Sequence, residues 1–239
     1  MIKLGTQNIS ALHLGGQEIK KAYMGETLVL GEEKKPSRLP EGYTEIEYIE
    51  ASGTQYINTN VKPTSKIKFT VDIEPLTKPT EILDYMMFAQ SQYVPSSSGA
   101  SKYFFILKFG SNGLQISQAY VTSSATYKTI STNNNPRRMV AVVDYPNKKA
   151  LIEGESELSL TGIATSTSMT TISILKEPSN RKNDIKAKLY SCQIEVDGAS
   201  VRDFVPCINP SGAVGLYDLV GAKFYGNAGT GVLSAGPAV

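Results

Sequence analysis

Tryptophan is absent from this chain of 239 residues, and histidine occurs only once, as His13. A single histidine confines Ser-His-Asp or Cys-His catalysis to the N-terminal segment that contains it. Structural zinc sites need clustered Cys and His ligands, and the two cysteines of this chain, 15 residues apart, do not form such a set. We therefore expect no metal, no cofactor and no histidine-based active site.

A strong charge of either sign is also lacking. The chain has 24 Lys and Arg against 22 Asp and Glu, and the excess lies before residue 41, with six basic and four acidic residues. Binding of nucleic acid needs a clustered basic face, which this pattern does not provide. No apolar run approaches the ~20 residues of a membrane span, and the N-terminus has no signal-peptide pattern. We expect cytoplasmic synthesis, no nucleic-acid partner and no membrane insertion.

The two cysteines, Cys192 and Cys207, lie in neighbouring strand-like segments. If the turn between these segments spans residues 197–200, Val196 faces Val201, and the two thiols become diagonal neighbours on one face. That geometry is marginal for a disulfide. Two buried free thiols are favoured because cytoplasmic synthesis keeps thiols reduced, and a disulfide remains the alternative.

Helical periodicity is scarce, and the prevailing pattern is that of strands. Residues 66–73 alternate polar and apolar side chains, and in residues 189–196 the alternation places Tyr190 on the same face as Cys192. Apolar runs at residues 139–143 and 103–109 are further strands, and turn residues separate these segments at short intervals. Only residues 79–88 could form either a capped helix or a buried strand. The pattern predicts an all-β fold, a sandwich or barrel.

The first 31 residues form a repeat with a period of ten, headed by Leu4-Gly5, Leu14-Gly15 and Met24-Gly25. We predict three short strands in residues 1–31, a charged linker at 32–38, a main domain at 39–239, and a poorly anchored tail from residue 226. So few strands are marginal in water, so the repeat needs partners. It either packs on the main domain or serves attachment and oligomerisation. The apolar residues expected to form its contacts are Ile9, Leu12, Leu14, Ile19, Tyr23 and Leu28.

The segment most typical of an enzyme is residues 45–50, which contains Glu45, Glu47 and Glu50. It is close to the E-I-D-x-x-E signature of laminarinase-type glycosidases, whose mechanism needs two carboxylates in one cleft. In a regular strand Glu45 and Glu47 share a face and Glu50 points to the other. The middle acid is also Glu instead of Asp, and there is no tryptophan to line a sugar cleft. We expect no enzyme and an edge strand with solvated carboxylates.

Two polar loops could bind a ligand. Carbohydrate sites combine an aromatic face with planar polar groups, usually on loops held by a rigid scaffold. Residues 90–93 and 123–138 offer such groups, although ordinary polar loops have a similar composition. The predicted ligand-binding residues are Tyr93, Tyr127, Asn133, Asn134, Asn135 and Arg137.

Two blocks of sequence resemble a known family. The first comprises residues 39–50 (LPEGYTEIEYIE) and 53–59 (GTQYINT), and the second contains KLYSC, VRDFVPC, GLYD and FYGNAGTG between residues 188 and 231. These blocks are similar to concanavalin-like (laminin-G-like) jelly-roll domains of bacteriophage and prophage tail proteins. The Leu-Gly repeat resembles segments that precede such domains. The match covers about half of the chain, at both ends.

The resemblance implies a concanavalin-like jelly-roll β-sandwich in a receptor-binding or tail-fibre subunit of a virion, made in the host cytoplasm. It implies a homotrimer, contacts with other tail or baseplate proteins, and recognition of a bacterial surface glycan. It gives no calcium-ligand cluster. A structural or decoration protein without a ligand is the first alternative, and a glycosidase is the second.

Overall fold

The computed structural model describes residues 37–77, 113–114, 129–132, 135–160, 170–175 and 186–239 in full, and elsewhere only the backbone of short strands. By its contacts the chain divides into two compact units, Met1–Ser37 with Val239, and Arg38–Ala238. The division falls at the end of the predicted linker, residues 32–38. No helix occurs in the described parts, and every strand pairing is antiparallel.

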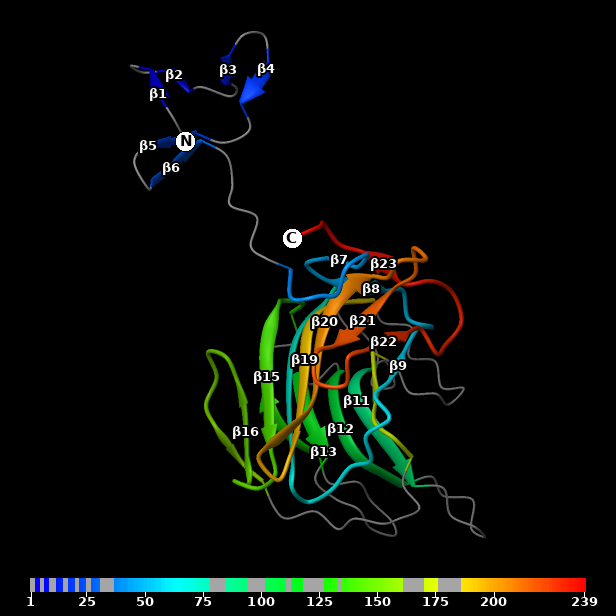
Figure 1. Ribbon diagram of the computed structural model, residues 1–239. Coiled ribbons are helices and arrows are strands. Elements are labelled where there is room, and N and C mark those ends of the chain that lie inside the picture. Colours follow the sequence, from blue (N-terminus) through cyan, green and yellow to red (C-terminus); the bar gives the residue numbers. More distant parts are fainter. Residues whose placement is uncertain are drawn as a thin grey trace. The chain divides into compact units, whose positions relative to one another are not determined.

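The second unit is a sandwich of two antiparallel sheets, which confirms the predicted all-β jelly-roll fold. Figure 1 shows β11, β12 and β13 behind β15, β19 and β20. The larger sheet has 11 strands, and a main path of eight in the order β17 (Leu158–Ser159), β16 (Lys149–Ile152), β15 (Met139–Asp144), β10 (Ile67–Pro75), β19 (Ala187–Val196), β20 (Ala199–Ile208), β21 (Val214–Asp218) and β22 (Lys223–Gly226). Off this path, β7 (Thr44–Glu45) pairs with β20, and β8 (Ile49–Ala51) lies between β19 and β23 (Ser234–Ala235).

The smaller sheet has six strands. Their order is β14 (Tyr127–Ser131), β13 (Gly113–Ser117), β12 (Lys102–Gly110), β11 (Tyr85–Tyr93), β18 (Ser173–Ile174) and β9 (Ile57–Asn58). The ambiguous segment 79–88 therefore enters a strand at Tyr85, whereas residues 78–84 lie outside the described residues.

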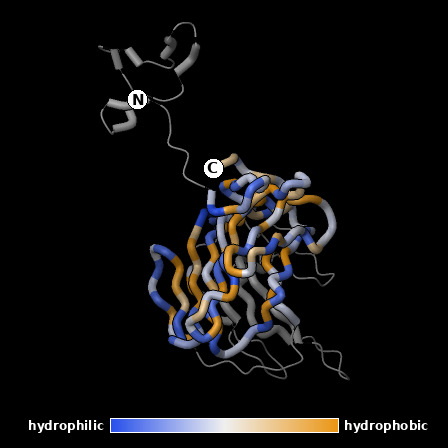
Figure 2. Tube along the Cα trace, in the orientation of Figure 1, coloured by the Kyte–Doolittle hydropathy of each residue, from blue (hydrophilic) through white to orange (hydrophobic). Residues whose placement is uncertain are grey.

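The core fills the space between the sheets. Strand β10 alternates buried and half-buried residues along its whole length, as its sequence predicts, and Phe69 and Ile73 are 0% exposed. Ile57 and Ile174 from the smaller sheet belong to the same cluster. Figure 2 shows hydrophobic and hydrophilic residues alternating along the strands. Burial of each such side chain contributes roughly 1.5–3 kcal/mol relative to its exposure, so the sandwich has a core of its own.

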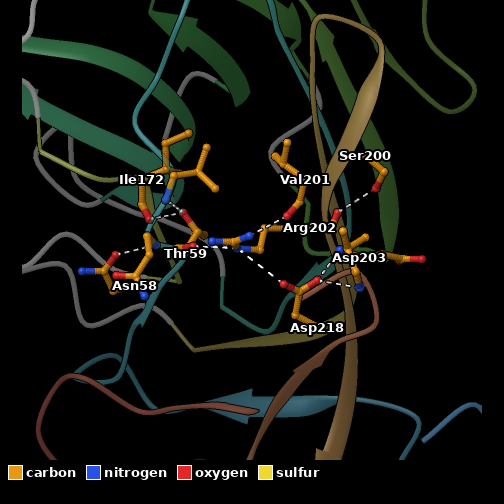
Figure 3. Close-up of polar contacts among 11 residues, drawn as sticks. Asn58, Thr59, Ile172, Ser200, Val201, Arg202, Asp203 and Asp218 are labelled. Atoms are coloured by element: carbon orange, nitrogen blue, oxygen red, sulfur yellow. Dashed lines mark hydrogen bonds and ion pairs between the residues drawn. The ribbon is translucent and has the colours of Figure 1, made fainter. Parts of the chain in front are cut away.

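A polar link inside the sandwich joins the two sheets (Figure 3). Arg202 on β20 donates from Nε to the backbone oxygen of Thr59, just after β9, at 2.9 Å. The same Nε lies 3.6 Å from Oδ2 of Asp218, which is 0% exposed. Oδ1 of Asp218 accepts hydrogen bonds from the backbone N–H groups of Asp203 and Val220. The link therefore fixes the end of β21 and the facing strand β9 together.

The two cysteines differ from their prediction in register. The turn has only two residues, Asp197 and Gly198, both with positive φ. Val201 of β20 then forms a bulge opposite Ile194 and Glu195, so Cys192 faces Phe204 instead of Val205. A shift of one residue exchanges the faces of a strand. Cys192 therefore lies in the main core, and Cys207 lies in a second cluster with Leu39. The prediction that both thiols share one face is wrong, and both are free and buried.

The described residues of the N-terminal unit form six short strands, not the predicted three. They form three separate hairpins: β1 (Lys3–Leu4) with β2 (Gln7–Asn8), β3 (Leu12–Leu14) with β4 (Gln17–Ile19), and β5 (Ala22–Met24) with β6 (Thr27–Leu30). Leu4 pairs with Gln7, and the other two hairpins follow the same spacing. Each row is a whole hairpin because glycine at the first position of a two-residue connection favours a tight turn inside the row.

The C-terminal tail is better anchored than predicted. Leu233 is 2% exposed, β23 pairs with β8, and Ala238 forms a bridge with Ile46. The side chain of Asn227 accepts a hydrogen bond from the backbone N–H of Tyr56 at 3.1 Å, which ties the start of the tail to the residue just before β9. Backbone pairing and the burial of Leu233 thus hold the tail in place, although the tail has few large apolar residues.

Candidate functional site

Among the described residues, a separate segment packs over only one half of the outer face of the larger sheet, the face turned away from the core. We call the other half the bare half. Over β20–β22, the segment before β7 packs Leu39 and Tyr43 against a second small core that includes Tyr217. The ring centroids of Tyr43 and Tyr217 lie 5.0 Å apart in an edge-to-face arrangement. On the strands β10, β15 and β19, the outward residues are instead half-buried polar and charged side chains with a few valines. The bare half therefore presents polar and charged groups that a ligand could contact.

A β-bulge places an aromatic side chain on this bare half. Asp72 of β10 pairs with Ser191 of β19, but the next residue, Ile73, pairs with Leu189, so Tyr190 is left without a partner. The extra residue lets Leu189 and Cys192 both face the core, while Tyr190 joins the outward residues. Bulges often re-aim a side chain in this way and are frequent beside functional sites.

Tyr190 lies against a guanidinium that an ion pair holds in place. The guanidinium carbon of Arg138 is 3.6 Å from the centroid of the Tyr190 ring. Arg138 also donates from Nε and Nη2 to the two carboxylate oxygens of Asp72, at 2.9 and 2.7 Å. This bidentate contact and the ring together fix the plane of the guanidinium. Its side chain remains 55% exposed, and Nη1 makes no bond to another described residue.

A second tyrosine extends the arrangement. The rings of Tyr48 and Tyr190 meet edge to face with centroids 5.3 Å apart, and Nζ of Lys188 lies 4.5 Å from the centroid of Tyr48. The hydroxyl of Tyr190 donates to Glu74 at 2.8 Å, and Lys188 lies 3.9 Å from the same carboxylate. We call this group the Tyr190 cluster: Tyr48, Asp72, Glu74, Arg138, Lys188 and Tyr190.

Glycine at position 236 is required for the cluster to keep its shape. A Cβ atom there would lie only 2.9 Å from the ring of Tyr48, and the N–H of Gly236 donates to the backbone oxygen of Tyr48. The C-terminal segment therefore rests directly on one of the two aromatic rings. A larger residue would push Tyr48 away from Tyr190.

The electrostatics of the cluster are balanced. Two cations and two carboxylates cancel, so its net charge is zero. Burial, and then the hydrogen bond to Glu74, raise the pKa of Tyr190 to about 12, so its hydroxyl stays a donor at neutral pH. The hydrogen bond to Asp72 raises the pKa of Arg138. The cluster offers aromatic rings, a flat guanidinium and two carboxylates, which are groups that bind hydroxyl pairs and sugar rings without transferring protons.

The structure places the residues of the predicted binding loops without testing their role. Arg137 turns to Glu155 at 2.9 Å, and the same oxygen accepts a bond from the hydroxyl of Ser131. Arg137 therefore braces the loop, and the next residue, Arg138, reaches the cluster. Asn135 is exposed, Tyr93 and Tyr127 lie at the end of β11 and the start of β14, and Asn133 and Asn134 lie outside the described residues.

Three residues of the Tyr190 cluster, Arg138, Tyr190 and Tyr48, are only weakly marked in the sequence. Arg138 is adjacent to Arg137 in a loop that was already a candidate, but composition does not say which arginine points outward. Tyr190 was assigned to the inner face because strict alternation puts it there, and nothing in the local sequence marks the bulge. Tyr48 lies within residues 45–50, where only the carboxylates of Glu45, Glu47 and Glu50 match a known catalytic pattern.

The carboxylates of residues 45–50 lie on different elements. Strands β7 and β8 have different partners, so Glu45 and Glu50 do not belong to one continuous strand. Arg38 forms an ion pair with Glu45 at 2.5 Å, and Glu50 lies opposite Lys188 in the ladder. Among the described residues, no group of three or more His, Cys, Asp or Glu side chains could hold a metal ion. In the same residues, no helix is long and apolar enough to cross a membrane.

Comparison with known proteins leaves the family open. No family model matches the chain, and no curated protein matches it either. Among solved structures, the chain is similar to a cysteine variant of alginate lyase A1-II', with 11% sequence identity and a TM-score of 0.33. The match covers 58% of this chain and 66% of that chain.

Proposed function

We propose that the chain is the attachment subunit of a phage virion, and that it recognises bacterial surface carbohydrate through the Tyr190 cluster. The observation that carries this proposal is the bulge in β19, which moves an aromatic residue out of the core alternation and into a set of planar polar groups. A buried tyrosine would serve packing alone, whereas this one lies beside an exposed, fixed guanidinium. The resemblance of residues 39–59 and 188–231 to phage tail domains supports the setting.

The three N-terminal hairpins complete the proposal. An open surface cluster binds a sugar weakly, and linking several copies raises the overall strength by making later binding events intramolecular. Isolated two-stranded hairpins are marginal in water, so partners that cover their apolar residues would stabilise them. We propose that Ile9, Leu12, Leu14, Ile19, Tyr23 and Leu28 mediate a homotrimer and contacts with tail or baseplate proteins.

The test is binding of the full chain to the surface polysaccharides of host bacteria, measured on a glycan array and on whole cells. Arg138→Ala removes the exposed guanidinium, and we expect it to abolish binding. Lys149→Ala is the matched control, because Lys149 is also ion-paired and similarly exposed, at 54%, but pairs with Glu157 away from the cluster. Equal binding by both variants would contradict the role of the cluster, and a blank array would contradict the function.

A structural or decoration role in the virion is the second candidate. It is favoured by the contact of Gly236 with Tyr48, because the cluster then fastens the C-terminal segment to the sheet. In that case Arg138→Ala would lower the urea midpoint of unfolding, and the intact chain would bind no glycan.

A further inference from the structure

We propose that the bare half of the outer face binds an uncharged glycan chain that lies along strands β10 and β19. This inference rests on the proposed carbohydrate function and adds the class of ligand and its direction. The platform that carries it consists of the outward residues of the two strands together with Arg138. These residues are Lys68, Thr70, Asp72, Glu74, Lys188, Tyr190, Ser191, Gln193 and Glu195.

The platform is long enough for several sugar rings. Lys68 and Glu74 are six residues apart in one unbroken strand. At about 3.3 Å per residue this gives about 20 Å, the length of about four linked sugar rings. The Tyr190 cluster forms one end, and the ion pair of Lys68 with Glu195, at 2.8 Å, forms the other. A ligand bound only at the cluster would leave most of this surface unused.

The charges on the platform exclude a polyanion as its preferred ligand. Three cations and three carboxylates are present, and each cation has a carboxylate partner within the platform: Lys68 with Glu195, Arg138 with Asp72, and Lys188 with Glu74. The net charge is therefore zero, and no cation is left without a counter-charge. An acidic polysaccharide or a phosphate-bearing polymer would need such cations, because the attraction comes from a field of one sign. An uncharged chain has no such requirement.

Between the charged ends lie neutral hydrogen-bonding groups. Thr70 pairs directly with Gln193 across the two strands, and both side chains are half-buried on the outer face. Neither side chain makes a hydrogen bond to another described residue. A hydroxyl and an amide together supply donors and acceptors, which matches the hydroxyl groups of a sugar. The hydroxyl of Ser191, which is exposed beside Asp72, continues the same row.

A protein partner fits this surface less well. The centres of protein interfaces are depleted of Lys, Glu and Asp and enriched in large apolar and aromatic residues. Here six charged residues occupy the platform, and its one aromatic residue already lies against Arg138. Desolvating three ion pairs at once would oppose burial beneath a protein. A hydrated glycan can hydrogen-bond to the same pairs without removing all of their water.

The experiment uses the full chain on an array of uncharged and anionic bacterial polysaccharides, followed by calorimetry with fragments of one to six sugars from the best ligand. We expect uncharged ligands only, an affinity that rises up to about four sugars, and a Kd that changes by less than about twofold between low and high salt. Gln193→Ala should weaken binding of the longer fragments by about tenfold and leave single sugars unaffected. Gln193→Glu is the second variant, because it keeps the volume and removes the amide donors.

Lys223→Ala is the control, because it changes an exposed residue on β22, an edge strand of the same sheet that is separated from β19 by β20 and β21. Circular dichroism verifies that each variant is folded. Binding restricted to anionic polysaccharides, or a Kd that rises tenfold with salt, would overturn the inference and leave the attachment function standing. An affinity independent of fragment length would overturn the lengthwise direction. Binding to no polysaccharide at all would overturn the proposed function itself.

Discussion

The buried ion pair of Asp218 and Arg202 allows a sharp test of how the sandwich is held together. Asp218→Asn keeps the volume of the side chain and keeps Oδ1, which accepts the backbone N–H groups of Asp203 and Val220 at 3.0 and 3.1 Å. It removes the negative charge that lies 3.6 Å from Nε of Arg202. The substitution therefore changes the electrostatic part of the link with little effect on its shape.

The expected loss follows from burial. Breaking a fully buried ion pair by removing one partner costs about 3–5 kcal/mol, because the other charge stays buried and unpaired. Arg202 retains 20% exposure of its side chain and donates to the backbone oxygens of Thr59 and Val201. These contacts offset part of the penalty, so we expect a loss of about 2–3 kcal/mol in the free energy of unfolding.

The assay is urea unfolding of the full chain at neutral pH, followed by far-ultraviolet circular dichroism. The control is Asp197→Asn, which breaks the ion pair with Lys66 in which the two side chains are 67% and 61% exposed. Exposed pairs contribute about 0–1 kcal/mol, so the control should move the urea midpoint little. Equal midpoints for the two variants would refute the idea that the Asp218 pair fixes the two sheets together.

Three further predictions concern the rest of the chain. Burial raises the pKa of Cys207 from its usual 9.0 to about 12, so between these values the folded chain keeps a proton that the unfolded chain loses. The free energy of unfolding should therefore fall as the pH rises from about 9 to about 12. The urea midpoint should fall less over this range in Cys207→Ala than in the unchanged chain. Gly229→Ala would place a Cβ atom 2.2 Å from the backbone oxygen of Thr54, and we expect a loss of about 1–3 kcal/mol. The thermal midpoint should be lower than that of Gly226→Ala, where the nearest atom, a ring carbon of Phe224, would lie 3.4 Å from the new Cβ. Removal of residues 1–31 should convert a trimer to a monomer by light scattering, and an unchanged stoichiometry would contradict the role of the hairpins.

The fold was largely predictable because alternation between core and solvent leaves a direct trace in the sequence. Strand β10 shows the pattern without interruption, and its inward residues, such as Ile67 and Val71, are 0% exposed. Turn residues such as Asp197-Gly198 mark the ends of strands just as clearly. Such signals depend only on residues close together in the sequence, so they can be recognised without a structure.

The candidate site was less predictable because it depends on contacts between distant segments. Tyr48, Asp72, Arg138 and Tyr190 come together from four parts of the chain. A composition argument finds the loop that contains Arg138, but it cannot tell which of two adjacent arginines turns outward. That choice is made by Glu155, which binds Arg137 and leaves its neighbour free to meet Asp72.

Two bulges, one in β19 and one in the neighbouring strand β20, decide which residues reach the outer face. The bulge at Tyr190 moves an aromatic ring to the outer face while Leu189 and Cys192 stay in the core. The bulge at Val201 shifts the register of β20, and Cys207 lies in the second cluster. A regular strand would have placed both tyrosine and cysteine inside the sandwich and left a plain polar outer face. Tyr190 reaches the bare half of the outer face only because β19 carries one residue more than its partner β10 requires. Irregularity in the ladder, not a distinctive local motif, thus marks the part of the sheet most suited to binding.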